Sequence, residues 1–168
     1  MKYLKNLIFI NGTMGVGKTT TSKELQKLLP KNVLLDGDWC WNSSPFIVTE
    51  ETKSMVLDNI SYLLNRFIEC SEYENIIFCW VMDEQSIIDD ILSRLNTENC
   101  SIKLFSLICN EEALKSRLLK DIQTEVRLED IIPRSISRIG KYFNHNTEKI
   151  DVSYISAKEA AKIISTKL

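Results

Sequence analysis

The chain has 168 residues, of which 44% are hydrophobic and 26% charged, and its formal net charge is −2. This length suits one domain with a single hydrophobic core, and the slightly acidic balance argues against general nucleic-acid binding. No apolar run approaches the length of a membrane span, and the first residues do not resemble a cleavable leader, so we expect a cytoplasmic protein without a membrane partner. The five cysteines lack C-x-x-C spacing, which is typical of reduced thiols.

A strand, a loop and a helix open the sequence. The strand is expected over 6–11 and the helix over 18–29, and the loop between them fits G-x-x-x-x-G-K-[ST], the P-loop that binds nucleoside triphosphates. Its glycines let backbone N–H groups converge on phosphate, Lys18 can reach the β- and γ-phosphates, and the Thr19 hydroxyl can ligate Mg²⁺. The alternative, a glycine-rich turn with an unrelated lysine, is disfavoured by the strand and helix on either side. We expect ATP to be bound by Gly12, Thr13, Met14, Gly15, Val16, Gly17, Lys18, Thr19 and Thr20.

Two carboxylates follow the second expected strand, residues 32–35. Asp36 and Asp38 flank Gly37, and the carboxyl end of a parallel strand places such residues beside the phosphate site. One carboxylate can help to hold Mg²⁺, and the other can accept the proton of an attacking hydroxyl. An ordinary acidic turn is the alternative, because Asp-Gly is a common turn pair.

Aromatic side chains come next along the chain. Trp39, Trp41 and Phe46 can line a pocket for the phosphoryl acceptor by stacking on a ring, or they can pack as core beneath the helix expected over 50–69. The sequence leaves both possibilities open. Stacking would mean an acceptor with a flat or apolar portion.

The remaining elements continue to alternate. Strands are expected over 76–81, 102–108 and 149–154, and helices over 50–69 after an N-cap at Thr49, over 84–95, and from Asn110 to about 119. Asp83 is expected to cap the helix over 84–95 rather than to bind metal, and a capping box opens the last helix at Ser156. The pattern predicts an α/β fold with a five-stranded parallel sheet covered by helices on both faces.

A basic segment precedes the last strand. Residues 117–141 carry six basic and four acidic side chains, and a continuous helix would place Arg127, Arg134, Arg138 and Lys141 on one face. An arginine here can neutralise charge on a transferring phosphate, although a solvated charged helix would have the same composition. His145 lies in a polar loop and is expected at the surface.

These motifs resemble the small P-loop kinases of the nucleotide-kinase group, which include adenylylsulfate, gluconate, shikimate and chloramphenicol kinases. The resemblance implies that Asp38 is the base, that Asp36 supports Mg²⁺, and that the loop at Ser156 holds adenine. It also implies that residues 117–142 form a lid, with Arg117 as its first arginine and Arg127 as its second. One departure stands out: Trp39, Cys40 and Trp41 occupy the place where adenylylsulfate kinases have Asn and a nearby Arg.

The sequence thus predicts one P-loop domain over 1–168 with the three-layer, nucleotide-kinase-like fold. We expect a phosphotransferase that moves the γ-phosphoryl group of ATP, with Mg²⁺, to a nucleotide, a nucleoside or a hydroxylated metabolite or antibiotic. Trp39, Trp41 and Phe46 join Asp38 as candidate acceptor contacts. The alternatives are a nucleoside-triphosphatase and a regulatory module that binds nucleotide without turnover. The protein is expected to act as a monomer or homodimer, without nucleic acid.

Overall fold

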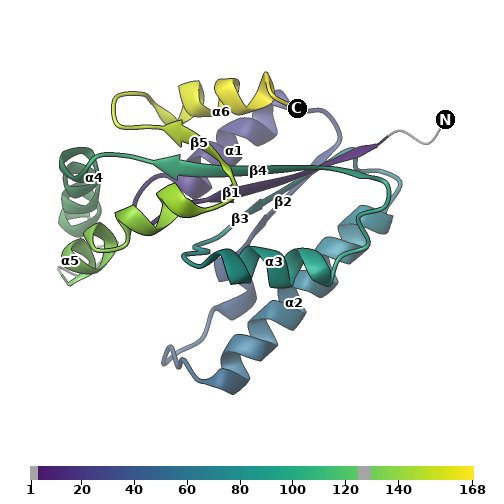
Figure 1. The fold of residues 1–168 in the computed structure, drawn as a ribbon, viewed down its shortest axis with the longest axis horizontal. Coiled ribbons are helices and arrows are strands. Elements are labelled where there is room, and N and C mark those ends of the chain that lie inside the picture. The colour runs from purple at the N-terminus through teal and green to yellow at the C-terminus, as the bar shows by residue number, and fades with distance from the viewer. Residues whose placement is uncertain (1–3, 125–129) are drawn as a thin grey trace.

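The computed structural model describes residues 4–124 and 130–168, and Figure 1 shows its arrangement. Its strands form one five-stranded sheet in the order β2-β3-β1-β4-β5, and every pairing in it is parallel. The predicted sheet is therefore confirmed. The strands are β1 (Lys5–Asn11), β2 (Asn32–Asp36), β3 (Asn75–Cys79), β4 (Cys100–Ile108) and β5 (Glu148–Asp151).

Helices cover both faces of this sheet, which gives the three layers predicted from the alternating pattern. In Figure 1, α1 and α6 lie on one face and α2 and α3 on the other, while α4 and α5 lie beyond the end to which the β4 arrow points. No helix in the described part of the chain is long and apolar enough to cross a membrane. The helices are α1 (Lys18–Leu28), α2 (Glu50–Glu69), α3 (Gln85–Ser93), α4 (Glu111–Gln123), α5 (Ile131–Ile136) and α6 (Ala157–Ser165), with 3-10 turns η1 (Gly37–Trp41) and η2 (Ile139–Asn144).

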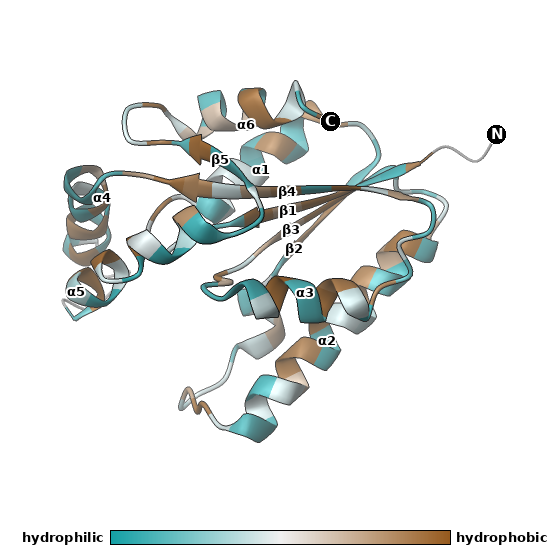
Figure 2. Ribbon diagram, in the orientation of Figure 1, coloured by the Kyte–Doolittle hydropathy of each residue, from teal (hydrophilic) through white to brown (hydrophobic). Residues whose placement is uncertain are grey.

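The central strand β1 divides the core in two. Leu7 and Phe9 pack in the cluster formed with α2 and α3, whereas Ile8 and Ile10 pack in the cluster formed with α1 and α6. Because successive side chains of a strand point to opposite faces, a strand covered on both sides is a continuous apolar run. Figure 2 shows this pattern, with hydrophobic strands between helices whose outer faces are hydrophilic.

Some boundaries differ from those predicted. The third strand ends at Cys79 rather than at residue 81, and the fifth ends at Asp151 rather than at residue 154. In both cases the chain leaves the sheet at the carboxyl edge after one more backbone hydrogen bond, from Trp80 to Ile10 or from Val152 to Ile108, and Trp80 and Val152 line a cavity there. The helix α2 has the predicted bounds, and the predicted N-cap Thr49 accepts the backbone N–H of Thr52.

The basic segment is not one continuous helix. It contains the end of α4, the short helix α5 and the 3-10 turn η2, so the shared face predicted for its basic residues does not exist as such. Arg127 lies outside the described residues, and its predicted role stays a prediction. Arg134 and Arg138 nevertheless approach the same cavity from this segment.

Candidate nucleotide and acceptor site

The phosphate loop joins β1 to α1 at the carboxyl edge of the sheet. Gly17 precedes the first helical residue with φ of 104°, a left-handed conformation that favours glycine, and no side chain caps the helix. The first N–H groups of α1 therefore present a positive helix end to the loop, which is the arrangement that binds phosphate. Gly15 also has a positive φ, and a Cβ there would lie 2.4 Å from Leu118.

Most of the predicted loop residues line one cavity of ≈ 850 Å³, a size typical of ligand sites. Gly12 and Thr13 support the loop from behind instead. The N–H of Gly12 donates to Oδ1 of Asn11 at 2.8 Å, and the hydroxyl of Thr13 donates to the carbonyl of Ser135 at 3.0 Å. The loop residues that line the cavity are Met14, Gly15, Val16, Gly17, Lys18, Thr19 and Thr20.

The side chains of Thr19 and Asp36, both predicted to bind Mg²⁺, lie in contact. The Thr19 hydroxyl donates to Oδ2 of Asp36 at 2.7 Å, and Oδ1 of Asp36 accepts the N–H of Asp38 at 3.0 Å. The side chain of Lys18 turns back over the loop, and its Nζ donates to the Thr13 carbonyl at 3.0 Å. Mg²⁺ prefers oxygen ligands and commonly binds one carboxylate together with substrate phosphates. The residues present therefore fit a magnesium ion bound with a triphosphate.

Asp38 is held by a residue that the sequence did not reveal. Nε1 of Trp80 donates to Oδ1 of Asp38 at 3.1 Å, and a Cβ on Gly37 would lie 2.4 Å from the Trp80 indole. Trp80 directly follows β3, whose last residue Cys79 is paired in register with Asp36. A strand order in which β2 and β3 are neighbours would have predicted this proximity.

The aromatic residues after Asp38 divide between cavity and solvent. Trp41 and Phe46 line the cavity and contact each other, with ring centroids 4.8 Å apart. Trp39 does not line the cavity and is 56% exposed, so the structure does not place it with the other predicted acceptor contacts. Residues 39 and 41 lie in the 3-10 turn η1, in which side chains two residues apart point in different directions.

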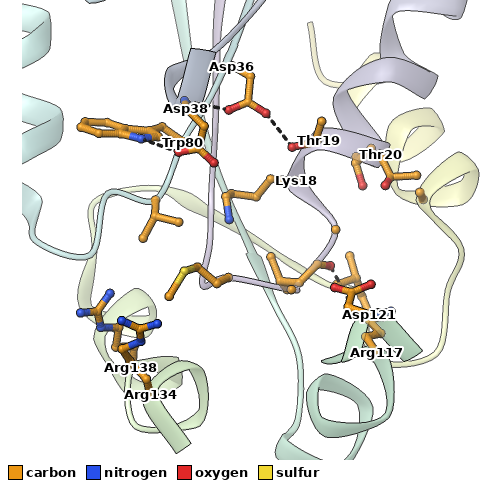
Figure 3. A pocket seen from close by; sticks show the side chains of 18 of the residues that line it. Lys18, Thr19, Thr20, Asp36, Asp38, Trp80, Arg117, Asp121, Arg134 and Arg138 are labelled. Atoms are coloured by element: carbon orange, nitrogen blue, oxygen red, sulfur yellow. Dashed lines mark hydrogen bonds between the residues drawn. The ribbon is translucent and has the colours of Figure 1, made fainter. Parts of the chain in front are cut away.

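The basic residues reach the cavity from two sides (Figure 3). Arg117 lies with Asp121 on one side, where its guanidinium donates to the carbonyls of Val16, at 3.3 Å, and of Val152. Arg134 and Arg138 lie on the other side, the side of Trp80. Arg117, predicted as the first lid arginine, is thus bound to backbone near the phosphate loop, whereas Arg134 and Arg138 line the cavity on the side of Trp80.

The loop before α6 borders the same cavity. Ser156 caps this helix, because its hydroxyl accepts the N–H of Glu159 at 3.2 Å, and it does not itself line the cavity. Its neighbours Ile155 and Ala157 do line the cavity. The predicted contact of Ser156 with adenine therefore stays a prediction, with the adjoining backbone in position for it.

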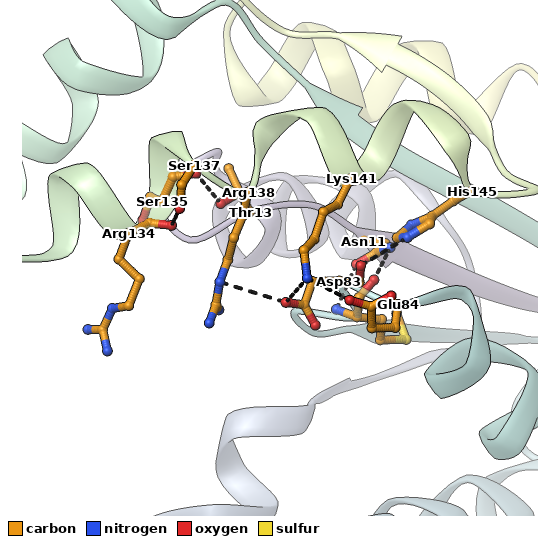
Figure 4. A network of polar contacts seen from close by, with 11 residues as sticks. Asn11, Thr13, Asp83, Glu84, Arg134, Ser135, Ser137, Arg138, Lys141 and His145 are labelled. Atoms are coloured by element: carbon orange, nitrogen blue, oxygen red, sulfur yellow. Dashed lines mark hydrogen bonds and ion pairs between the residues drawn. The ribbon is translucent and has the colours of Figure 1, made fainter.

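Two predictions about the segments behind the loop are wrong (Figure 4). His145 is 7% exposed rather than a surface residue, because its ring packs against Tyr142 and hydrogen bonds to Asn11 at 3.1 Å. Asp83 does not cap α3, whose N-cap is Glu84. Instead Asp83 forms ion pairs with Arg138, at 3.7 Å, and Lys141, at 3.5 Å, which hold η2 and the chain before it beside the end of β3.

Comparison with known proteins agrees with this geometry. The family model described as an AAA domain matches residues 8–138. No curated protein matches the sequence.

Solved structures with the same fold span nearly the whole chain. The tunicamycin resistance protein of Deinococcus radiodurans has a TM-score of 0.70 at 19% identity and covers 97% of this chain and 95% of its own. A gluconokinase from Sinorhizobium meliloti 1021 has a TM-score of 0.68 at 15% identity, with 95% and 89% covered. Shikimate kinase from Acinetobacter baumannii, in complex with shikimate, has a TM-score of 0.63 at 19% identity, with 99% and 97% covered. At these identities the likeness is one of fold.

Proposed function

Because this chain belongs to the AAA domain family and has the fold of P-loop kinases, we propose that it is an ATP-dependent kinase of a small molecule that carries a hydroxyl group. The observation that carries the proposal is that the two carboxylates at the end of β2 have different surroundings. Asp36 is engaged by the hydroxyl of Thr19 at 2.7 Å, while Asp38 lines the cavity beside Trp80. A carboxylate in this position can accept the proton of an acceptor hydroxyl, and the formation of a phosphate ester distinguishes this use from activation of water.

The reaction would use each residue in a distinct role. Asp38 would accept the proton of the acceptor hydroxyl as the hydroxyl oxygen bonds to the γ-phosphorus. The bond between that phosphorus and the β–γ bridging oxygen breaks, and ADP leaves. Mg²⁺, held by Thr19 and Asp36, supplies charge neutralisation on the phosphate oxygens when it is bound. Lys18 and the first N–H groups of α1 hold the phosphates.

Arginines of the segment 117–142, which we propose as a lid, would complete the site. Arg134 and Arg138 line the cavity on the acceptor side, so they can approach the charge that develops on the transferring group. Arg117 already binds two backbone carbonyls and would chiefly position the phosphate loop and the end of β5. Arg127 keeps the role that the resemblance implies for a second lid arginine.

Replacement of the proposed base tests this function. In Asp38→Asn, transfer of label from γ-labelled ATP to a pooled set of hydroxylated compounds should fall by about 10²- to 10⁴-fold, because the proton has no acceptor. Binding of ATP, measured by calorimetry, should be retained. Asp89→Asn is the matched control, since Asp89 lies on the exposed face of α3, outside the cavity, where it accepts a hydrogen bond from Gln85. Full transfer by Asp38→Asn would show that the base is another group.

A further inference from the structure

The acceptor side of the cavity has an apolar and aromatic wall. Trp41, Phe46, Val48 and Trp80 all line the cavity, and three of them come from the stretch between η1 and α2. Phe46 is 61% exposed and Val48 54%, and Ile47 between them is 52% exposed. Such a run of exposed apolar side chains at the mouth of a cavity marks a surface that gains stability when a ligand covers it.

Contacts within the chain support this wall. The Trp80 indole is held by its hydrogen bond to Asp38 and by close packing on Gly37, where even a Cβ would collide with it. Trp41 and Phe46 support each other with a tilted contact of 47° between their ring planes. A preorganised aromatic surface binds a flat or apolar partner at little cost in conformational entropy.

Charged side chains border this wall without forming part of it. Lys18, Asp38, Arg134 and Arg138 line the same cavity, and Arg134 and Arg138 also form ion pairs with Asp130 and Asp83. An open-chain polyol laid along the aromatic wall would place several hydroxyl groups against carbon without partners, which is unfavourable. A ring with one or a few hydroxyl groups would place its face on the wall and a hydroxyl at Asp38.

From this juxtaposition we infer that the acceptor is an alcohol whose hydroxyl is carried by a planar or apolar ring system, rather than an open-chain sugar or sugar acid. The inference rests on the proposed function, since it treats the Asp38 side of the cavity as the acceptor site. Trp41 and Phe46 then act as specificity-determining residues, because they contact the ring and not the reacting oxygen.

Calorimetric binding to the full chain, saturated with ADP and Mg²⁺ so that the nucleotide side is filled, tests the inference. The probes are matched pairs of ring-bearing alcohols and open-chain polyols, thymidine with gluconate and 2-phenylethanol with ribitol. We expect the ring-bearing member of a pair to bind at least about tenfold more tightly. Trp41→Leu should weaken that binding by about tenfold, and Phe46→Leu should weaken it in the same direction. Trp39→Leu, the same substitution two residues away on an exposed side chain outside the cavity, should leave it unchanged.

Two outcomes would overturn the inference: polyols that bind as tightly as their ring-bearing partners, or ring binding that survives both Trp41→Leu and Phe46→Leu. Phe46 is largely exposed, so its replacement is compatible with folding even where that of Trp41 is not. The proposed function fails separately. If ring compounds bind in a way that depends on Trp41 but receive no label from ATP, the ring-binding site is supported and the kinase function is refuted. If label passes to polyols whether or not Trp41 is replaced, the kinase function is supported and the ring-binding site is refuted.

Discussion

Nε1 of Trp80 lies 3.1 Å from Oδ1 of Asp38, so a residue that follows β3 fixes the carboxylate that follows β2. The two strands are neighbours and parallel, with Asp36 and Cys79 in register, so the segments that follow them leave the sheet at the same edge. Trp80 is therefore a positioning residue for the proposed base as well as part of the cavity wall. It couples the orientation of Asp38 to the surface on which the acceptor would lie.

Trp80→Phe separates these two roles, because it keeps an aromatic ring and removes the N–H donor. Loss of a hydrogen bond to a charged group on a partly exposed side chain should lower kcat by about three- to tenfold. Affinity for ATP and KM for a ring-bearing acceptor should change little. Steady-state kinetics of Trp80→Phe beside Trp39→Phe make the comparison, and an equal kcat in the two variants would remove Trp80 from the positioning of Asp38.

Asp36→Asn tests the magnesium site. Asp36 is 5% exposed and accepts hydrogen bonds from the Thr19 hydroxyl and the Asp38 N–H. Its replacement removes the negative charge beside the proposed Mg²⁺ and disturbs the orientation of the Thr19 hydroxyl. The Mg²⁺ concentration that gives half-maximal transfer should rise by about 10- to 100-fold. Asp89→Asn, on the surface of α3, should leave it unchanged. An unaltered Mg²⁺ requirement in Asp36→Asn would place the metal elsewhere.

Asn11→Ala should destabilise the fold although Asn11 touches no proposed substrate. The side chain is fully buried, its Oδ1 accepts the N–H groups of Gly12 and Met82 at 2.8 Å each, and its Nδ2 donates to the Met82 carbonyl at 2.8 Å. Its loss leaves these backbone groups buried without partners, which should lower the free energy of unfolding by about 3 kcal/mol. Urea denaturation measures the change. Asn59→Ala, at an exposed site on α2, should cost less than about 0.5 kcal/mol, and an equally small effect for Asn11→Ala would contradict the bonding described.

Cys79 makes stability depend on pH in the alkaline range. Burial, with a smaller contribution from the charge of Asp36, raises the pKa of its thiol from 9.0 to about 12. The unfolded chain releases this proton near pH 9 and the folded chain does not, so the contribution to stability is complete below pH 9 and is lost as the pH rises through about 12. Between these limits the slope is about −1.4 kcal/mol per pH unit.

Urea denaturation from about pH 8 to about pH 11 measures that slope. The free energy of unfolding should decline less steeply with pH in Cys79→Ala than in the parent chain. The smaller side chain lowers stability at every pH and does not alter this difference in slope. Val56→Ala, which shortens a buried side chain without a titrating group, is the matched control and should retain the parental slope. Parallel curves for the parent and Cys79→Ala would show that this thiol does not titrate differently on folding.

The phosphate loop and the sheet were predictable because their patterns are local. The spacing from Gly12 to Thr19 specifies a backbone, and the apolar runs of β1 and β3 could be satisfied only by burial on both faces. The N-cap at Thr49 and the capping box at Ser156 were predictable for the same reason, since each involves residues three apart.

The contacts between distant segments were not predictable in this way. Trp80 meets Asp38, and His145 meets Asn11, only because strand order and the path of the chain after α4 bring them together. A polar neighbourhood in the sequence suggested a surface position for His145, but its environment includes Asp83 and Asn11, which are 62 and 134 positions away. The basic segment expected to form one face of a continuous helix is divided among α4, α5 and η2, and periodicity alone does not show where those elements end.

We propose that the cavity beside the phosphate loop transfers the γ-phosphoryl group to an alcohol and not to water. The decisive experiment follows label from γ-labelled ATP, with Mg²⁺, in the presence of a broad set of ring-bearing and open-chain alcohols. A small-molecule kinase forms a labelled phosphate ester whose formation depends on Asp38, with little release of inorganic phosphate when no acceptor is present. Steady release of labelled inorganic phosphate, without an ester from any alcohol, would instead identify a nucleoside-triphosphatase.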